Sequence, residues 1–167
     1  YFQKWWEKDV EAMVDKDFNH PSVIMYSIGN EIPEAGTPEG AQQGREIAEK
    51  IRSLDKSRYI INCVNGLMAV MDQLDEIAAE IQQEKSGEES SESEEEEINE
   101  MMNNLTEIMD EVVAQEKVGE LMEETFDSVD IAGYNYMTSR YEPDGKKYPQ
   151  RVICGSENHP PNIDLNW

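Results

Sequence analysis

Basic residues are scarce in this sequence. Fourteen Lys and Arg stand against 37 Asp and Glu, and the formal net charge is -23. A protein of this charge repels the phosphates of nucleic acids and the headgroups of anionic lipids. We therefore expect neither a nucleic acid nor a membrane as a partner.

Long apolar runs are also missing. No stretch approaches the 18 or more residues of a membrane span, and no basic start with an apolar core indicates a signal peptide. We expect a soluble protein, and the cytoplasm as its location. The chain starts directly in an amphipathic pattern and stops abruptly, so we also expect a piece of a longer protein.

Cysteine is nearly absent, with only Cys63 and Cys154 in 167 residues. Both lie inside apolar runs and at no metal-ligand spacing, which indicates small buried hydrophobic side chains. This usage favours a reducing compartment and argues against a disulfide framework.

Helical patterns alternate with apolar runs of strand length along the chain. Such alternation predicts an α/β fold with a parallel sheet. Helices are expected over residues 2–14, 41–54, 67–81 and 98–113, and strands over 23–29, 58–64, 128–136 and 151–157. Residues 30–40 and 138–149, which contain Pro and Gly, are expected to form loops.

Residues 84–97 interrupt this alternation with an acidic low-complexity segment. It holds eight Glu and one Lys. Such a segment buries too little apolar surface to offset its ordering entropy, so we expect a disordered, solvated insertion within the domain. A role as a binding tail for basic proteins or cations is the alternative.

Polar side chains follow the predicted strands at the point where each strand ends. They are Asn30, Glu31, Asn65, Tyr136 and Glu157. A parallel sheet places its chemistry at this rim. Two carboxylates from different strands, Glu31 and Glu157, suit glycoside hydrolysis, because one protonates the leaving oxygen while the other attacks or positions water. Two solvated loop carboxylates are the plainer interpretation of the same pattern.

Three segments resemble glycoside hydrolase family 2. DFNHPSVIMYSIGNEIPEAG is similar to its acid/base segment, and SVDIAGYNY and RVICGSE are similar to its sixth and seventh barrel strands, in the same order and spacing. The resemblance covers nearly the whole chain apart from the acidic segment. It implies a partial (β/α)8 TIM barrel, about strands 4 to 7 with flanking helices, so residues 1–167 would be an incomplete catalytic domain.

The resemblance also implies roles for individual residues. Glu31 would be the acid/base and Glu157 the nucleophile of a retaining, double-displacement mechanism. Asn30 would bind the sugar 2-hydroxyl, and Tyr136 would support the nucleophile carboxylate. His159, two residues after the nucleophile, is a candidate for the sugar pocket.

Position in the sequence pattern leaves other residues outside the site. His20 precedes its strand at the far end and is expected to be structural, and Trp5 and Trp6 are expected in the core. The sequence departs from the family where arginine, tryptophan and threonine are common. Phe18, Tyr26 and Asn158 stand there instead, which puts sugar specificity in doubt but removes no catalytic carboxylate.

Retaining hydrolysis of terminal β-galactosides is the activity that the resemblance implies, with a carbohydrate as partner. The mechanism requires no cofactor, although Mg²⁺ or Na⁺ occurs in some relatives and no residues here indicate its site. Three alternatives remain: β-glucuronidase or β-mannosidase specificity, a non-catalytic half-barrel that binds carbohydrate, and an α/β enzyme in which Glu31 and Glu157 hold a divalent metal.

An incomplete barrel has a physical consequence for the isolated chain. Four strands leave two open sheet edges, and open edges invite pairing with a second copy. We therefore expect the chain to self-associate, and we expect weak or no activity from it. A monodisperse, well-folded monomer would contradict the first expectation.

Overall fold

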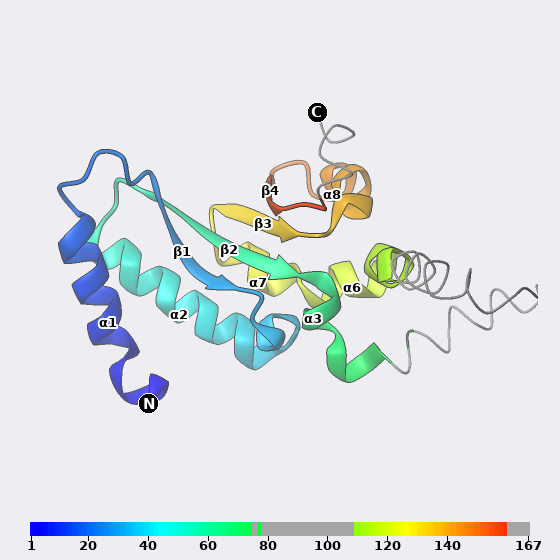
Figure 1. Cartoon of the computed structure of the whole chain (residues 1–167), viewed down its shortest axis with the longest axis horizontal. Coiled ribbons are helices and arrows are strands. Elements are labelled where there is room, and N and C mark those ends of the chain that lie inside the picture. Colours follow the sequence, from blue (N-terminus) through cyan, green and yellow to red (C-terminus); the bar gives the residue numbers. More distant parts are fainter. Residues whose placement is uncertain (75–76, 78–108, 160–167) are drawn as a thin grey trace, which may run out of the picture.

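The computed structural model describes residues 1–74, 77 and 109–159, and its centre is a parallel sheet (Figure 1). All neighbouring strands pair in parallel, in the order β1-β2-β3-β4. The strands are β1 (Met25–Asn30), β2 (Tyr59–Asn65), β3 (Ile131–Asn135) and β4 (Val152–Glu157). The predicted α/β fold with a parallel sheet is confirmed, and all four strands lie where the sequence predicts them.

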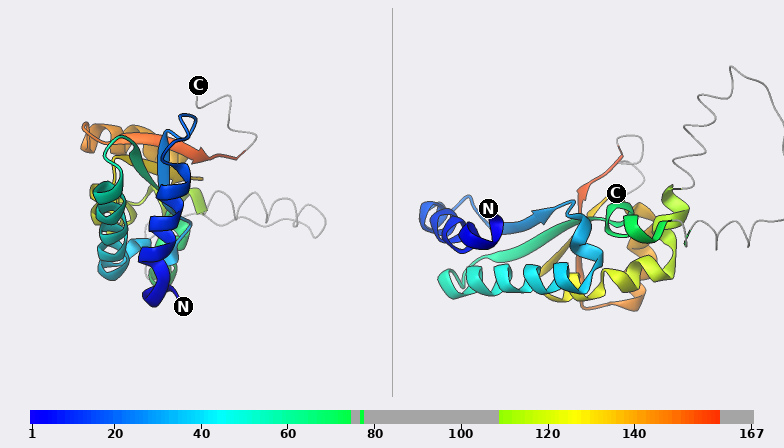
Figure 2. Two further views of the ribbon diagram at one scale, coloured as in Figure 1. Left: turned by 90° about the vertical axis from the view of Figure 1, so that its left-hand side faces the viewer. Right: turned by 90° about the horizontal axis from the view of Figure 1, so that it is seen from below.

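Helices gather on one side of this sheet (Figure 2). The α-helices are α1 (Phe2–Asp17), α2 (Pro38–Leu54), α3 (Gly66–Ala69), α6 (Glu116–Leu121), α7 (Glu123–Asp127) and α8 (Tyr141–Lys147). Short 3-10 turns are η1 (Pro33–Gly36), η2 (Met71–Gln73) and η3 (Thr138–Arg140). The α1 and α2 helices lie next to each other, and α2 also contacts α7.

Two apolar clusters hold the helices against the strands. One contains Val14, Tyr26, Ala48, Ile51 and Ile60, and joins α1 and α2 to β1 and β2. The other joins β2 and β3 to the segments between them, and its members are Ala35, Val64, Ala69, Val70, Ile77, Val112, Val113, Val118, Met122, Phe126, Ala132, Tyr134 and Met137. Ile60 and Val64, four residues apart on β2, thus face the same side of the sheet.

Two of the predicted loops contain helical structure. The α2 helix begins at Pro38 because Pro fits the first helical position, and Thr37 Oγ1 accepts a hydrogen bond from the Gly40 amide at 3.1 Å. The expected loop 138–149 contains η3 and α8, since Pro143 lies in the first turn of α8, where its missing N–H costs nothing. The prediction of two loops without helices was therefore wrong, because a proline in the first turn of a helix is compatible with that helix.

The helix expected over residues 67–81 is interrupted. The α3 helix ends at Ala69, and η2 follows after Val70. The acidic segment 84–97 lies outside the described residues, as does most of the helix expected over 98–113; of that helix, residues 109–113 are described and helical.

The predicted burial of the two tryptophans and of the two cysteines needs correction. Trp5 and Trp6 are half-exposed on α1, and Lys4 and Lys8 lie over the Trp5 ring at 5.3 and 4.8 Å from its centroid. The two tryptophan side chains therefore lie on the surface of α1 and not in the core. Cys63 and Cys154 are free thiols, as expected, but half-buried. The His20 side chain is exposed.

Strands β1 and β4 form the two edges of the sheet, and neither pairs with a further strand in the part of the chain that the structure describes. Exposed apolar side chains occur at both edges: Ile24, just before β1, is 64% exposed and Val152 58%. Self-association through these edges stays a prediction. None of the described helices is long and apolar enough to span a membrane.

Arg58, at the start of β2, ties the turn before β1 to the sheet. Its guanidinium donates to four backbone carbonyls, those of Asp17, Phe18, His20 and Val23. It also pairs with Asp55, whose side chain is buried. Hydrogen bonds from the Ser57 hydroxyl and amide, and then the charge of Arg58, lower the pKa of Asp55 to about 2.

This depressed pKa makes the stability of the chain depend on pH. The unfolded pKa of Asp is about 3.9, so Asp55 stabilises the fold fully above that pH and loses its contribution of about 2 kcal/mol as pH falls toward 2. We expect the difference in unfolding free energy between the wild type and Asp55→Asn to shrink over this range. Urea titrations of both proteins at pH 6, 4 and 2.5 measure it, and a difference that stays constant would contradict the prediction.

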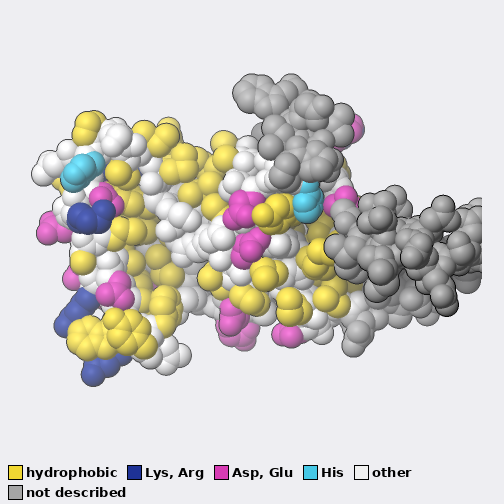
Figure 3. Space-filling view, viewed as in Figure 1, with side chains coloured by type: hydrophobic (Ala, Val, Ile, Leu, Met, Phe, Trp, Pro, Cys, Tyr) yellow, Lys and Arg dark blue, Asp and Glu magenta, His cyan; other side chains and the backbone are white. Residues whose placement is uncertain are grey.

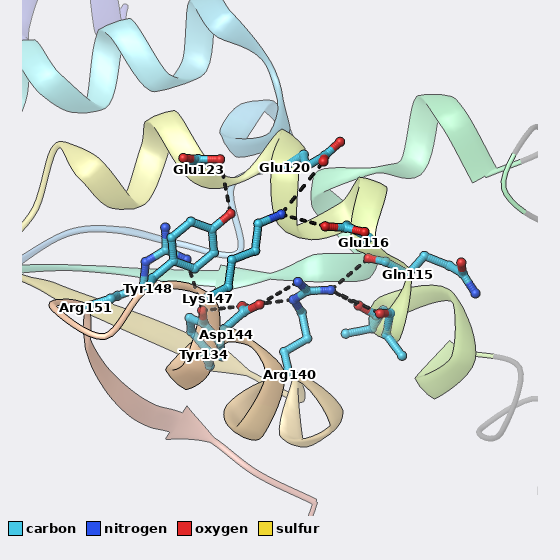
Figure 4. Close-up of polar contacts among 12 residues, drawn as sticks. Gln115, Glu116, Glu120, Glu123, Tyr134, Arg140, Asp144, Lys147, Tyr148 and Arg151 are labelled. Atoms are coloured by element: carbon cyan, nitrogen blue, oxygen red, sulfur yellow. Dashed lines mark hydrogen bonds and ion pairs between the residues drawn. The ribbon is translucent and has the colours of Figure 1, made fainter.

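A second buried ion pair fixes α8. Arg140 and Asp144 are 3% and 1% exposed, and Arg140 donates to both Asp144 oxygens at 3.0 and 2.6 Å. The remaining guanidinium nitrogen donates to the carbonyls of Val113, Ala114 and Gln115 (Figure 4). Arg140 therefore joins α8 to the chain segment before α6.

Strand β3 is connected to the same ion pair. The Tyr134 hydroxyl donates to Asp144 at 2.6 Å, and the Arg151 guanidinium lies 3.8 Å from the Tyr148 ring centroid (Figure 4). Burial, and next the hydrogen bond to Asp144, raise the pKa of Tyr134, so the phenol stays a proton donor. The network thus anchors β3 directly before the residues at its carboxyl end.

Candidate active site

The carboxyl ends of all four strands meet at one rim of the sheet, and the predicted site residues lie there. Acidic side chains and a histidine gather on the surface above this rim, with apolar side chains around them (Figure 3). Glu31, Tyr136, Glu157 and His159 are half-buried, while Asn30 is exposed. The structure therefore brings together the five residues that the sequence singled out as catalytic or substrate-binding.

Irregular backbone directs these side chains. The pairing register shifts between Ser27 and Asn30 on β1, and opposite Tyr134 and Asn135 the β4 strand contains one extra residue, Ser156. Such irregularities re-aim the residues that follow. Glu31 and Tyr136 then adopt positive φ angles of 54° and 56°. These are the only non-glycine residues in the described chain with positive φ.

Neighbouring strands hold both strained residues in place. The Glu31 amide donates to the Cys63 carbonyl at 2.8 Å, and the Tyr136 amide donates to the Glu157 carbonyl at 2.9 Å. Left-handed backbone at non-glycine residues is costly and persists where the surroundings fix it, which is typical of functional sites.

Asn65, at the end of β2, orients Glu31. Its side-chain amide donates to Glu31 Oε1 at 3.0 Å, while its Oδ1 accepts from the Leu67 and Met68 amides and caps α3. One residue thus begins a helix and positions a carboxylate. The sequence places Asn65 at a strand end but gives it no role.

Asn135, at the end of β3, contacts both carboxylates. Its Nδ2 lies 2.9 Å from Glu157 Oε1, 3.4 Å from Glu31 Oε1 and 3.1 Å from Asn30 Oδ1. Its side chain is fully buried. Sequence analysis missed Asn135, although a polar residue that follows an apolar strand and precedes Tyr136 could have identified it.

Tyr136 contacts Glu157 through its hydroxyl, which donates to Oε2 at 2.7 Å. This hydrogen bond and the charge of Glu157 raise the pKa of Tyr136, so the phenol remains a donor at neutral pH. The His159 ring lies 4.7 Å from the Tyr136 ring, centroid to centroid.

A cavity of about 250 Å³ opens beside these side chains. It is lined by Asn65, Leu67, Met109, Asp110, Val113, Tyr136 and His159. Apolar walls with a few polar groups at one end are typical of small-ligand sites. His20 lies outside the cavity lining, and Asn158 instead accepts a hydrogen bond from the Tyr141 hydroxyl at 2.8 Å.

The described residues contain no group of three or more His, Cys, Asp and Glu placed to hold a metal ion. They hold Glu31 and Glu157 through neutral donors only: Asn65, Asn135 and Tyr136. The arrangement therefore places two carboxylates side by side, each held by hydrogen bonds from neutral side chains.

Comparison with known proteins agrees with the resemblance in the sequence. The family described as "Glycosyl hydrolases family 2, TIM barrel domain" matches residues 2–142. A β-galactosidase, BoGH2A from Bacteroides ovatus, is 37% identical over 62 residues, which are 37% of this chain and 6% of that protein. A putative β-glucuronidase from Formosa agariphila is 37% identical over 46 residues, 28% of this chain and 4% of that protein.

Solved structures extend the similarity to the whole chain. A glycosyl hydrolase family 2 member from Bacteroides cellulosilyticus matches with a TM-score of 0.66 and 28% identity, over 100% of this chain and 16% of that one. The chain thus spans a small part of the relatives it matches, and its four parallel strands fit a partial barrel. It belongs to the TIM barrel domain of glycosyl hydrolase family 2.

Proposed function

We propose that Glu31 and Glu157 are the catalytic pair of a retaining β-glycosidase. The observation that carries the proposal is their shared donor: one amide nitrogen, Asn135 Nδ2, lies within 3.4 Å of an oxygen of each carboxylate. Membership of glycosyl hydrolase family 2 supports hydrolysis of a glycoside as the reaction.

The distance between the two carboxylates favours retention of configuration. Glu31 Oε1 and Glu157 Oε1 lie 3.4 and 2.9 Å from the same nitrogen, so the sum of these distances is the upper limit of their separation. That limit falls below the roughly 6.5–9.5 Å of inverting enzymes. The separation of roughly 5–5.5 Å that is found in retaining enzymes lies within this limit.

In the proposed mechanism Glu157 attacks the anomeric carbon while Glu31 protonates the departing oxygen. The bond between that carbon and the aglycone breaks as the ester with Glu157 forms. Glu31, now ionised, takes a proton from water, whose oxygen attacks the same carbon and releases Glu157. Tyr136 holds the Glu157 carboxylate in position during both displacements, and Asn30 lies where it can contact the sugar.

We propose a β-galactoside, a neutral sugar, as the substrate. BoGH2A is a β-galactosidase, which supports this choice. The second candidate is a β-glucuronide, favoured by the Formosa protein. A glucuronide carries a negative charge, and in the described chain neither Glu31 nor Glu157 has a Lys or Arg among its hydrogen-bond partners. This environment disfavours an anionic sugar.

The test is covalent trapping. A 2-deoxy-2-fluoro-β-galactoside with a dinitrophenolate leaving group should add one fluorosugar to the chain, and peptide mapping should place it on Glu157. The matching 2-fluoro-β-glucuronide, under the same conditions, is expected to add nothing.

Glu157→Gln is the control and should form no adduct with either reagent. An adduct on another residue would overturn the assignment of the nucleophile. An adduct from the glucuronide alone would select the second candidate, and no adduct from either would favour a chain that binds carbohydrate without turning it over.

A further inference from the structure

Asn135 is the one described residue whose side chain contacts both Glu31 and Glu157. Its amide group has two N–H hydrogens but three acceptors within reach, namely Asn30 Oδ1, Glu31 Oε1 and Glu157 Oε1. The contact with Glu31 is the longest, at 3.4 Å, and that with Glu157 the shortest, at 2.9 Å. The two N–H groups therefore cannot form short hydrogen bonds to all three oxygens at once.

The orientation of this amide follows from its neighbours. The Ser156 hydroxyl donates to Asn135 Oδ1 at 2.6 Å, which fixes the oxygen on the side away from the carboxylates. The reversed orientation would place the amide oxygen against the acceptor oxygens of both carboxylates, with no donor hydrogen between them. The two carboxylates and the Ser156 hydroxyl together keep the donor side of Asn135 toward the catalytic pair.

We propose that Asn135 is a positioning residue that transfers one hydrogen bond between the two carboxylates as the negative charge moves between them. The inference rests on the proposed function. When Glu157 becomes an ester it loses its charge, and Glu31 becomes ionised as it gives up its proton. An N–H group already within 3.4 Å of Glu31 then shortens that contact, and the second displacement reverses the change.

Such a donor stabilises charge on both sides of the reaction, which neither of the other amide or phenol donors can do. Asn65 contacts Glu31 but not Glu157, and Tyr136 contacts Glu157 but not Glu31 through a hydrogen bond. Loss of a hydrogen bond that holds a charged group in its reacting position is expected to slow a step by roughly 10- to 100-fold. Variants of these three residues can therefore be compared: one residue hydrogen-bonds both carboxylates, and each of the other two hydrogen-bonds one.

Two rate measurements with the dinitrophenyl 2-fluoroglycoside separate the carboxylates. Dinitrophenolate needs no proton to leave, so the rate of its release reports the attack by Glu157. Azide attacks the glycosyl-enzyme without help from a base, so the acceleration of adduct loss by azide reports how far Glu31 is impaired.

We expect Asn135→Leu to slow dinitrophenolate release and to raise the azide acceleration, each by roughly 10- to 100-fold. Asn65→Ala should change only the azide acceleration, and Tyr136→Phe only the release. Asn135→Ala, which leaves room for a donating water, should change both rates less than Asn135→Leu does.

Retained fold is checked by circular dichroism and urea unfolding of every variant. If Asn135→Leu changes only one of the two rates, the shared hydrogen bond is refuted while the proposed function stands. If the unmodified chain forms no adduct, the proposed function fails and this inference with it. Ser156→Ala should slow dinitrophenolate release and raise the azide acceleration, as Asn135→Ala does, and no effect would contradict the orientation argued above.

Discussion

Replacing Glu31 with alanine is expected to lower kcat/KM for a phenyl β-galactoside by roughly 10²- to 10⁴-fold, the range of general acid–base catalysis. Phenolate is a poor leaving group and needs the proton of Glu31. For a dinitrophenyl galactoside the same variant should keep its first step and accumulate the glycosyl-enzyme, since only the hydrolysis of the ester needs a base. Azide should then restore turnover and give a β-galactosyl azide of retained configuration.

Glu34→Ala is the matched control, because it removes an exposed carboxylate from the same loop, three residues after Glu31. Its kcat/KM should equal that of the unmodified chain for both substrates. Equal losses on the phenyl and dinitrophenyl substrates for Glu31→Ala would show that the carboxylate does not act as the acid. An α-galactosyl azide would show that the reaction proceeds without a covalent intermediate.

The carboxylates of this site could be predicted because strand ends in a parallel sheet share one rim. Glu31 and Glu157 each follow an apolar run, so the fold alone brings them to the same edge. Their separation could not be predicted, since it depends on the irregular pairing before Asn30 and Asn135 and on the positive φ of Glu31. Glycine, the usual residue for positive φ, is absent at Glu31, so no sequence pattern marks its backbone conformation.

The two amides that hold the carboxylates were harder to predict than the carboxylates. The sequence places Asn65 at a strand end only, and neither its cap of α3 nor its hydrogen bond to Glu31 follows from that position. Asn135 is separated from Glu31 by more than a hundred residues. Contacts of this kind depend on register between strands, which composition and periodicity do not fix.

Elements whose position follows from the spacing of apolar residues could be predicted from the sequence. Elements that depend on a single polar contact could not. The strand that ends at Asn65 follows from its apolar run, whereas α8 forms in a Pro- and Gly-containing stretch. There Arg140 and Asp144, spaced four residues apart, pair on one helix face and bury their charges. Arg58 likewise fixes the turn around Phe18, where the family commonly has an arginine in the turn itself.

Loss of the Arg140 guanidinium is expected to have the largest effect on stability. Arg140→Met leaves the Asp144 carboxylate buried without its charged partner and removes the guanidinium hydrogen bonds to the carbonyls of Val113, Ala114 and Gln115, which should lower the free energy of unfolding by about 3–5 kcal/mol. Asp144 also accepts a hydrogen bond from the Tyr134 hydroxyl, and Tyr134 directly precedes Asn135 on β3. The variant should therefore also make the position of Asn135 less well fixed. Urea unfolding followed by tyrosine and tryptophan fluorescence measures the first effect, and the rate of fluorosugar labelling the second.

Lys146→Met provides the control, since Lys146 pairs with Glu142 at the same i,i+4 spacing on the same helix but both side chains are more than 70% exposed. An exposed pair contributes about 0–1 kcal/mol, so this variant should unfold almost as the unmodified chain does. Arg140→Met combined with Asp144→Leu removes the unpaired charge and should recover part of the loss, because the cost lies in the isolated carboxylate more than in the missing attraction. Equal destabilisation by the Arg140 and Lys146 variants would mean that burial adds nothing to the Arg140–Asp144 pair and that this pair does not anchor β3.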